Sequence, residues 1–587
     1  CNGIDGINGT DGTNGINGTD GLTALVEISV ESNGVNCPNG GLKIEVGIVE
    51  NGNSSLNESE IDNTQYICNG ADGSASPNTM LTSITSPAAT LGCTAGGRVI
   101  ANGLDNGDGG GISQNGVLES GEEDYITTYC SKYKIWQIDD INREVSSISS
   151  DTYMNILVGD TIYFKANDGN SGDELWAHDT SNLSTWQVAD INPGFSGSSP
   201  GNSMAILVGD TLYFSASDGS SGNELWAHDT SNSSTWLVAD ILTGSLSSNP
   251  GSGGISGTSS ILVGDRLYFQ AEYEINNREL WVHDTSNSST WLVAEINSNS
   301  GGSSNPGEYM MILVGDTIYF DATNGNGGKK MWAHDTSNSS TWLVYDINDP
   351  GDRMGVLVGD TIYFDGYQSA TGAELWAHDT SNSSTWLVDD INNGNSNSGP
   401  GSLMAIVVGE TIYFDAVDGS SGKELWAHDT SNASTWLVAD INNGSSGSNP
   451  GDWGALITGN IFYFIADDGI VGYEMWAHDV SNSSTWLVAD INIGNGGSYP
   501  GLMNPIVFGD TFYFLANNGI NGYELWTHDL SSTSTWLVAD INNGVSNSLS
   551  GYFLAISVGD TLYFSASDGI NGTELWAVMI EHSIIYD

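Results

Sequence analysis

Four short apolar stretches recur together along most of the chain. In the copy at residues 204–241 they read MAILV, TLYFSAS, ELWAHDT and STWLVADI. Hydrophobic and polar positions alternate within them, and β-branched and aromatic residues are frequent, as expected for strands. Clusters of Gly, Asp, Asn and Ser separate the stretches and mark turns. The pattern predicts four antiparallel strands in each copy.

The four-strand pattern repeats at a nearly constant interval. The anchor GDTIYF, or a variant of it, begins at glycines that lie 44 to 55 residues apart, most often 50. A period of this length is typical of a propeller or a solenoid, and four antiparallel strands per unit form a propeller blade. The anchors begin at Gly159, Gly209, Gly264, Gly315, Gly359, Gly409, Gly459, Gly509 and Gly559. We therefore expect an all-β protein with a multi-bladed β-propeller of nine four-stranded blades.

The two ends of the array are complementary. It begins with an isolated fourth strand, KIWQIDDIN at residues 134–142, and its last copy stops after the third strand, leaving MIEHSIIYD as a tail. If the isolated strand completes the last blade, nine blades close into a ring without edge strands. The alternatives are eight closed blades with one degenerate unit, or an open arc.

The residues before the array divide into three parts. Residues 1–21 carry glycine at every third position, which is the spacing of a collagen-like or polyproline-II segment. Without proline such a stalk is ordered only by self-association, and a Gly-Asn-Asp linker is the alternative. Residues 22–70 and 79–130 resemble each other and are interpreted as two small β modules, joined by a linker at 71–78. The propeller then occupies residues 131–587.

All five cysteines lie before residue 131, and none has the repeated spacing of a zinc site. Pairing Cys37 with Cys68 and Cys93 with Cys130 encloses segments of similar length, so two local disulfides are the simplest arrangement. This pairing predicts an oxidising, extracellular location. Cys1 is left over: it either ends an earlier module that precedes residue 1, or it is the lipid-modified first residue of a lipoprotein.

Each small module contains an acidic loop that resembles an EF-hand or dockerin calcium loop. If Glu60 takes position 12 in the first module, Asn51 and Asn53 fall on ligand positions, but position 1 is Val49. The second loop has lost its first ligand, and two aspartates lie just before it. Because calcium needs six to eight oxygen ligands, a degenerate turn without metal is the alternative. The candidate ligands are Asn51, Asn53, Glu60, Asp105, Asp108 and Glu122.

Charge excludes several classes of partner. The chain has 12 Lys plus Arg against 72 Asp plus Glu, a formal net charge of -60, so phosphate backbones and anionic membrane surfaces are repelled. No apolar run is long enough to span a membrane. Five of the few basic residues nevertheless fall in three neighbouring repeats, where they could meet an acidic sector of a second molecule. They are Arg266, Arg278, Lys329, Lys330 and Arg353.

The turn between the third and fourth strands carries an Asn-x-Ser sequon in seven repeats, whereas the eighth copy has Ser532. A turn of this composition forms by Asx hydrogen bonding alone, but exposed sequons in a secreted protein are also acceptors for N-linked glycans. Up-and-down topology places these turns at one end of each blade, and the DG turns with the long connections at the other. The predicted glycosylation sites are Asn182, Asn232, Asn287, Asn338, Asn382, Asn432 and Asn482.

The remaining chemically suggestive residues repeat too regularly to form one active site. The ELW and fourth-strand tryptophans are expected to pack between blades, with Trp453 as a candidate for a surface contact. The histidine of each His-Asp pair is expected to make local hydrogen bonds, because neighbouring blades hold equivalent residues too far apart to share a metal. No nucleophile elbow, HExxH motif or phosphate loop occurs, so we expect no enzymatic activity and no certain cofactor.

The repeated ELW, the DGxxGxELW spacing and the aspartate-containing turn after it resemble the ELWxxDGT-repeat family of secreted microbial β-propellers over about residues 131–587. The Asp-Gly-Thr of that family is replaced here by Asp-Thr-Ser or a relative. The Gly triplets and disulfide modules are similar to N-terminal regions of microbial surface proteins. The resemblance implies a propeller and an extracellular setting, and it assigns no activity.

Together these features favour a secreted cell-surface structural or adhesive protein that displays a glycosylated propeller. Its copies are expected to associate through the stalk and the basic repeats, as subunits of an extracellular filament. The alternative is a carbohydrate- or calcium-binding recognition propeller. A polysaccharide-acting enzyme is the third hypothesis.

Overall fold

The computed structural model describes residues 23–38, 40–49, 56–68, 79–85, 93–95, 97–141, 154–253, 260–298, 302–350, 354–551 and 555–586. The predicted Gly-triplet stalk at 1–21, the linker at 71–78, and Cys1, Asn51, Asn53 and Arg353 lie outside these residues. Strands dominate the described chain, with one short 3-10 turn, η2 (Asp108–Gly110). Within it, no helix has the length and apolar character needed to cross a membrane.

The chain divides into two compact units. Unit 1 comprises Cys1–Lys134, Phe508–Asp510 and Ile580–Asp587, and unit 2 comprises Ile135–Val507 and Thr511–Met579. The first strands are β1 (Thr23–Glu31), β2 (Gly41–Val49), β3 (Ile61–Cys68), β4 (Thr79–Thr85), β5 (Gly97–Asp105) and β6 (Glu123–Asp139).

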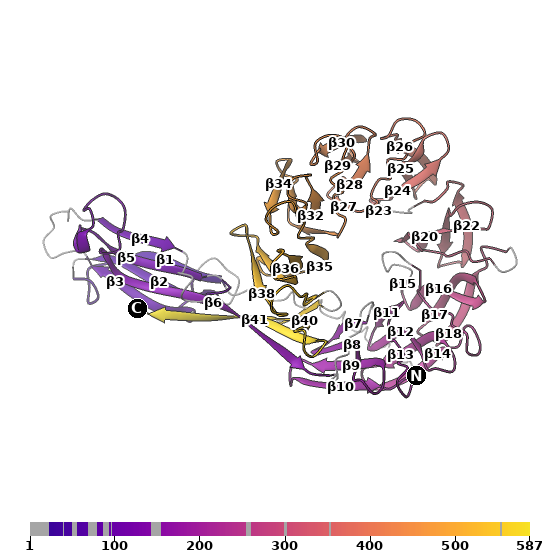
Figure 1. The fold of residues 1–587 in the computed structure, drawn as a ribbon, viewed down its shortest axis with the longest axis horizontal. Helices are drawn as coiled ribbons and strands as arrows, with labels where there is room; N and C mark the ends of the chain where they lie inside the picture. Colours follow the sequence, from indigo (N-terminus) through magenta and orange to yellow (C-terminus); the bar gives the residue numbers. More distant parts are fainter. Residues whose placement is uncertain are drawn as a thin grey trace, which may run out of the picture. The chain divides into compact units, whose positions relative to one another are not determined.

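Unit 2 is built from four-stranded antiparallel sheets that follow one another around a common centre (Figure 1). Eight of them consist of four strands that are consecutive in the sequence. These are β7 (Asn155–Val158), β8 (Thr161–Asn167), β9 (Asp173–Asp179), β10 (Ser184–Ala189); β11 (Ala205–Val208), β12 (Thr211–Ser217), β13 (Asn223–Asp229), β14 (Ser234–Ala239); β15 (Ser260–Val263), β16 (Arg266–Glu274), β17 (Asn277–Asp284), β18 (Ser289–Ala294); β19 (Met311–Val314), β20 (Thr317–Ala322), β21 (Lys330–Asp335), β22 (Ser340–Tyr345); β23 (Gly355–Val358), β24 (Thr361–Gln368), β25 (Gly372–Asp379), β26 (Ser384–Asp389); β27 (Ala405–Val408), β28 (Thr411–Val417), β29 (Lys423–Asp429), β30 (Ser434–Ala439); β31 (Ala455–Thr458), β32 (Ile461–Asp467), β33 (Tyr473–Asp479), β34 (Ser484–Ala489); β35 (Gly501–Phe508), β36 (Thr511–Asn517), β37 (Tyr523–Asp529) and β38 (Ser534–Ala539).

The ninth blade uses strands from both ends of the chain. Its sheet has the order β39-β40-β41-β6-β5-β4, with β39 (Ala555–Val558), β40 (Thr561–Ser567) and β41 (Thr573–Tyr586). The interpretation of residues 579–587 as a tail is wrong for 579–586, which continue β41. The part of this sheet that belongs to unit 2 consists of β39, β40 and parts of β41 and β6. The described residues of unit 2 therefore form a β-propeller of nine four-stranded blades, as the repeat spacing predicted.

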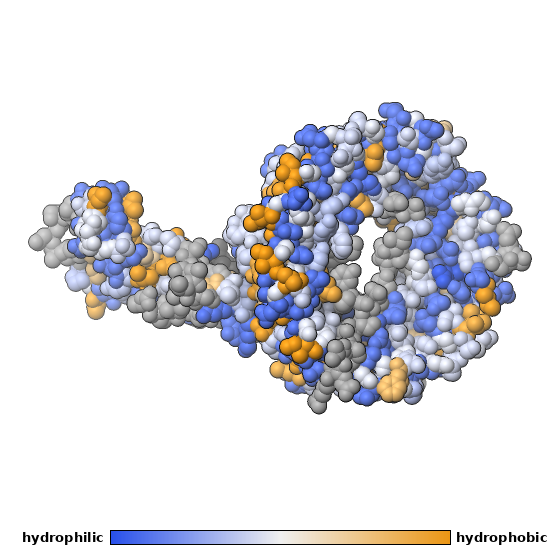
Figure 2. All heavy atoms as spheres, viewed as in Figure 1, coloured by the Kyte–Doolittle hydropathy of each residue, from blue (hydrophilic) through white to orange (hydrophobic). Residues whose placement is uncertain are grey.

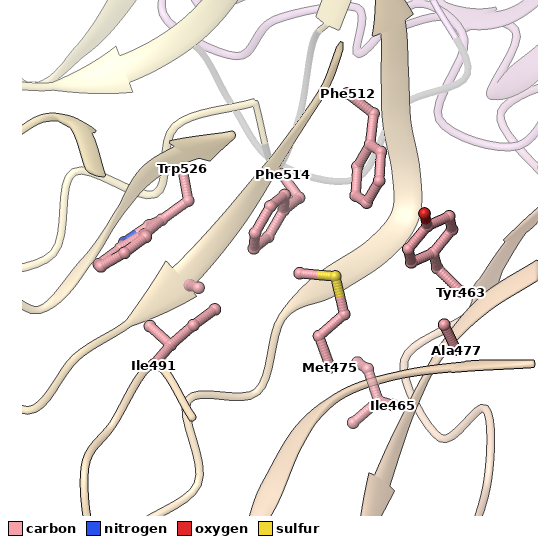
Figure 3. Packing of buried hydrophobic residues seen from close by; sticks show 9 residues of the cluster. Tyr463, Ile465, Met475, Ala477, Ile491, Phe512, Phe514 and Trp526 are labelled. Carbon is pink, nitrogen blue, oxygen red and sulfur yellow. The ribbon is translucent and has the colours of Figure 1, made fainter. Parts of the chain in front are cut away.

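Adjacent blades are held together by the two faces of the second strand. In β12 the residues from Leu212 to Ala216 are all buried, because both faces of this strand meet a neighbouring sheet. One cluster joins Tyr213 and Leu225 of the second blade to Leu267 and Phe269 of the third. Figure 3 shows the same packing between the seventh and eighth blades, where Met475 lies between Tyr463 and Phe514. Burial on both faces explains why these strands contain uninterrupted hydrophobic runs.

The first and last blades also share a hydrophobic cluster. It contains Ile162 and Phe164 of β8 together with Tyr563 and Leu575 of β40 and β41, and Trp136 of β6 packs against it. The amide of Ile141, just after β6, donates to Glu574 Oε2 at 3.1 Å. Full closure of the ring by the 134–142 strand stays a prediction.

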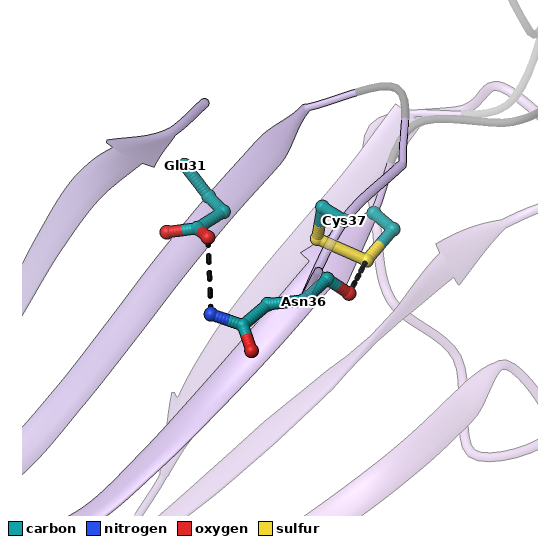
Figure 4. Close-up of a disulfide and its surroundings, with 4 residues drawn as sticks. Glu31, Asn36 and Cys37 are labelled. Atoms are coloured by element: carbon teal, nitrogen blue, oxygen red, sulfur yellow. Dashed lines mark hydrogen bonds between the residues drawn. A yellow bond between two sulfur atoms is a disulfide. The ribbon is translucent and has the colours of Figure 1, made fainter. Parts of the chain in front are cut away.

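Unit 1 contains two copies of one three-stranded design. β2 pairs with β3 and places Gly41 opposite Cys68, and β5 pairs with β6 and places Gly97 opposite Cys130. Both predicted disulfides are present, Cys37 to Cys68 and Cys93 to Cys130, with Cα atoms 4.9 and 5.0 Å apart. In Figure 4, Asn36 lies beside the first disulfide and donates its side-chain amide to Glu31 Oε1 at 3.2 Å.

Candidate functional site: the two ends of the blades

In the first eight blades, the hairpin that joins the third and fourth strands is organised by one aspartate. In the second blade, Asp229 Oδ1 accepts from the amide and the hydroxyl of Ser231 at 2.8 and 2.6 Å. Asn232 donates its Nδ2 to Asp229 Oδ2 at 2.6 Å and accepts the amide of Ser234 at 3.0 Å. These bonds, the Ser231 hydroxyl above all, lower the pKa of Asp229. The aspartate thus stays charged and fixes the turn.

The sequon asparagine stands at the exposed tip of this hairpin. The residue that follows it, Ser233 in the second blade, has a φ of 59°, a left-handed conformation that turns the chain back into the fourth strand. The hairpin also lies at the end of the blade that carries the Gly-Asp turn, since the Thr230 amide donates to the Asp210 carbonyl at 2.8 Å. The predicted acceptors are all exposed: Asn182, Asn232, Asn287, Asn338, Asn382, Asn432 and Asn482.

The histidines before these hairpins are buried between blades. His228 is 1% exposed, its Nδ1 lies 2.8 Å from Thr235 Oγ1 across the hairpin, and its ring contacts Tyr163 of the preceding blade with centroids 5.6 Å apart. His178 of the first blade contacts Tyr563 of the last in the same way, at 5.5 Å. Burial lowers the pKa of His528 to about 4. In the described part of the chain no group of three or more potential metal-binding side chains occurs.

A buried glutamate at the other end of eight of the nine blades was not anticipated from the sequence; the fourth blade has Lys330 at this position. Glu224, the first residue of ELW, is fully buried, and its carboxylate accepts the amides of Ile241 and Ser248 at 2.8 Å and the Ser248 hydroxyl at 2.6 Å. Burial, partly offset by these bonds, raises the pKa of Glu224 to about 7. The carboxylate ties the long connection to its own blade. The equivalent buried residues are Glu174, Glu279, Glu374, Glu424, Glu474, Glu524 and Glu574.

The connection end also carries exposed hydrophobic side chains. Five of them lie in three consecutive blades, whereas Phe195 and Leu246 lie in the connections after the first and second blades. The turns between the second and third strands of the seventh, eighth and ninth blades present Ile470, Ile520 and Ile570 at 73, 70 and 73% exposure; these turns contain Asp-Gly, Asn-Gly and Asp-Gly. The connections after the seventh and eighth blades add Ile493 and Val545. Figure 2 shows a hydrophobic band over the part of unit 2 where Figure 1 labels β34, β36 and β38. We call these five residues the apolar sector; the corresponding turn positions of the first, second and sixth blades are Asn170, Ser220 and Ser420.

The predicted calcium residues of the second module come together in one loop, without forming a recognisable metal cluster. Asp105 is 1% exposed and accepts the amides of Asn115 and Gly116 at 3.2 and 2.8 Å. Glu122 is 2% exposed and accepts the Gly107 amide at 2.5 Å. Asp108 is exposed and bonds to Asn106. In the first module, Glu60 Oε2 accepts the Asn57 amide at 2.8 Å, whereas Asn51 and Asn53 are outside the described residues.

The described members of the basic cluster are paired inside the chain. Arg266 lies 3.5 Å from Asp284, Arg278 lies 2.6 Å from Glu272, and Lys329 lies 2.6 Å from both Glu308 and Asp321. Lys330 lies 2.8 Å from Asp346. These positive charges are therefore compensated by carboxylates of the same chain.

Comparison with known proteins adds a domain name and no activity. Residues 24–68, the first disulfide module, match the model of a domain of unknown function, DUF7151. No curated protein matches the chain.

Solved structures resemble the chain only distantly. A puromycin hydrolase mutant in complex with PGG matches at 12% identity and a TM-score of 0.32, over 66% of this chain and 61% of its own. TolB from Acinetobacter baumannii matches at 10% identity and a TM-score of 0.26, over 57% of this chain and 77% of its own. An oligogalacturonate lyase in complex with manganese matches at 9% identity and a TM-score of 0.31, over 86% of this chain and 98% of its own. This chain thus spans less than two thirds of the hydrolase, and we take no function from these similarities.

Proposed function

We propose that this chain is an extracellular structural protein whose copies associate through the apolar sector and display glycans on the sequon hairpins. The observation that supports the proposal is the separation of two kinds of surface. Exposed isoleucines gather at the connection end of the seventh to ninth blades, whereas the repeated sequons stand at the opposite end. The two disulfides support an oxidising location.

The apolar sector is the best candidate for the association surface because exposing its hydrophobic side chains to water is unfavourable in free energy. Burying an isoleucine side chain is worth roughly 1.5–3 kcal/mol, and the sector presents five large aliphatic side chains on neighbouring loops. Single exposed hydrophobic residues are ordinary, whereas the same turn position filled by isoleucine in three successive blades is not.

Two features shape how association would occur. The net charge of -60 opposes contact between copies, so association is expected to strengthen as salt screens the repulsion. Asn571, a sequon asparagine next to the sector, is half-buried and donates to Gln137 Oε1 at 3.3 Å, so the sector keeps its apolar character. In this proposal, the stalk at residues 1–21 is a second element through which copies associate. The proposal assigns the chain no catalytic role.

The test is a measurement of molar mass by light scattering during size exclusion, over a range of protein and salt concentrations. The wild-type chain should associate at high salt, and the triple variant Ile470→Ser, Ile520→Ser, Ile570→Ser should elute as a monomer. Ile275→Ser is the matched control, because Ile275 is 66% exposed in the turn between β16 and β17, outside the sector. A wild-type chain that stays monomeric at every salt concentration contradicts the proposal.

A recognition propeller is the second candidate, favoured by the outer strands. The fourth-strand tryptophans are partly uncovered in six blades, and exposed indoles provide stacking surfaces for sugar rings. Binding of polysaccharides by the wild-type chain, lost in Trp386→Ala, would favour this candidate. The exposed fractions are 38–40% at Trp186, Trp236, Trp291, Trp342, Trp386 and Trp436.

A further inference from the structure

Lys165 is a buried amine held against a carboxamide. It lies in the middle of β8, is 2% exposed, and donates its Nζ to Asn202 Oδ1 at 2.8 Å. Asn202 belongs to the connection between the first and second blades, 37 residues further along the chain. Most repeats place an uncharged residue or an aspartate at the position of Lys165, such as Ser215 in the second blade. An amine in this position is therefore specific to the first blade.

A carboxylate completes the group. Asp173 Oδ2 lies 3.7 Å from Lys165 Nζ, and the other oxygen of Asp173 accepts the Asn167 side-chain amide at 3.1 Å. The side chain of Asp173 is 22% exposed, so it faces the lysine at the edge of the protein interior. Amine, carboxamide and carboxylate are the three groups needed to join lysine and asparagine through an amide bond: a nucleophile, an electrophile and a base that moves the proton.

We propose that Lys165 and Asn202 form an intramolecular isopeptide bond, with Asp173 as the proton-transfer group. Asp173 takes a proton from Lys165 Nζ, and the free amine attacks Asn202 Cγ. The tetrahedral intermediate collapses with cleavage of the Cγ–Nδ2 bond as Asp173 returns the proton to the departing nitrogen. Asp173 then takes the second proton from the attacking nitrogen and passes it to the ammonia. The lysine ammonium and the asparagine carboxamide thus become one secondary amide and an ammonium ion. No oxidant, reductant or cofactor is needed.

Two features favour the reaction at this site. The folded chain holds nucleophile and carboxamide within hydrogen-bonding distance, which removes the entropic cost of bringing them together. The bond would also fasten the connection between two blades to the second strand of the first blade, where the array begins. A covalent link of this kind restricts local opening of the connection.

Other lysines of the propeller supply internal comparisons. Lys423 contacts Ser402 Oγ and lies 3.1 Å from Asp415, and Lys329 contacts Glu308 and Asp321. Their described polar partners offer no carboxamide with ammonia as a leaving group. Lys330 contacts the Asn348 carboxamide, but its aspartate, Asp346, is 77% exposed and remains solvated, so we assign no bond there.

Mass spectrometry of the folded, full-length chain tests the proposal. A bond between Lys165 and Asn202 lowers the intact mass by about 17 Da, the mass of ammonia. Because a succinimide also forms with loss of ammonia, the deciding result is a branched peptide that contains both residues, identified by tandem fragmentation of a digest. Wild-type protein suffices for this measurement, so it does not depend on the folding of a variant.

Variants then assign the roles. Lys165→Arg and Asp173→Asn should lack the branched peptide, whereas Lys423→Arg should keep it. Absence of the branched peptide from the folded wild-type chain overturns the proposal, and its persistence in Asp173→Asn overturns the role of Asp173. Neither result bears on association through the apolar sector, so the two proposals fail independently.

Discussion

The buried glutamates predict an unusual dependence of stability on pH, which a single substitution isolates. Glu224 is fully buried and has three hydrogen-bond donors, yet burial raises its pKa from the ordinary 4.5 to about 7. A folded-state pKa above the unfolded value means that the contribution of this group is fully present below pH 4.5. It is lost as the pH rises through 7, because the folded chain then ionises a buried carboxyl at greater cost than the unfolded chain does.

The magnitude follows from the pKa change. Each tenfold change in proton affinity is worth about 1.4 kcal/mol, so a rise from 4.5 to about 7 corresponds to about 3 kcal/mol. Glu224→Gln keeps the shape of the side chain and cannot ionise. The stability of the wild-type chain relative to Glu224→Gln should therefore fall by about 3 kcal/mol between pH 4.5 and pH 8.

Guanidinium unfolding followed by tryptophan fluorescence at several pH values measures this difference, since the chain contains 19 tryptophans. Glu410→Gln is the control, because Glu410 lies exposed in a Gly-Glu turn and its removal changes the net charge equally. The reasoning would be refuted if the difference in unfolding free energy between wild type and Glu224→Gln stayed constant from pH 4.5 to 8. A constant difference would mean that the folded chain ionises Glu224 as easily as the unfolded chain does.

Three further predictions concern single residues. Ser234→Ala should remove one glycan, seen by mass spectrometry of secreted protein, while the Asp229–Asn232 bond keeps the hairpin folded; unchanged glycan mass would exclude Asn232 as an acceptor. The pKa of His528 is lowered to about 4, so the contribution of this residue to stability is lost as the pH falls from 6.5 to 4. In His528→Gln, the melting temperature should therefore fall less steeply over this pH range than in the wild-type chain. Calcium should raise the melting temperature of the wild-type chain and not of Glu122→Gln; equal responses would remove the second loop as a calcium site.

The blades could be predicted from the sequence because the same strand pattern returns nine times, so accidental variation in any one copy does not obscure it. The two disulfides could be predicted for a similar reason, since Cys37–Cys68 and Cys93–Cys130 enclose related modules. Residues 579–586 were misread as a tail because they follow no repeat and have no partner strand nearby in the sequence. Their partner strand, β6, begins at Glu123, far away along the chain.

The functional surfaces were harder to predict, because they depend on exposure and on contacts between distant residues. Glu224 looks like an ordinary polar position of a strand, and only its return in most copies, with a serine 24 residues later, signals a buried anchor. Ile470, Ile520 and Ile570 look like strand residues until their exposure is known. The Lys165–Asn202 contact spans 37 residues and occurs in one blade, so no repeat pattern reveals it.

Electron cryo-microscopy of the native protein, isolated from the cells that produce it, tests the proposed function most directly. The proposal predicts ordered assemblies in which copies meet through the turns that carry Ile470, Ile520 and Ile570, with glycan density on the hairpins at the opposite end of the blades. Dispersed single chains, or assemblies joined through the sequon hairpins, would contradict it.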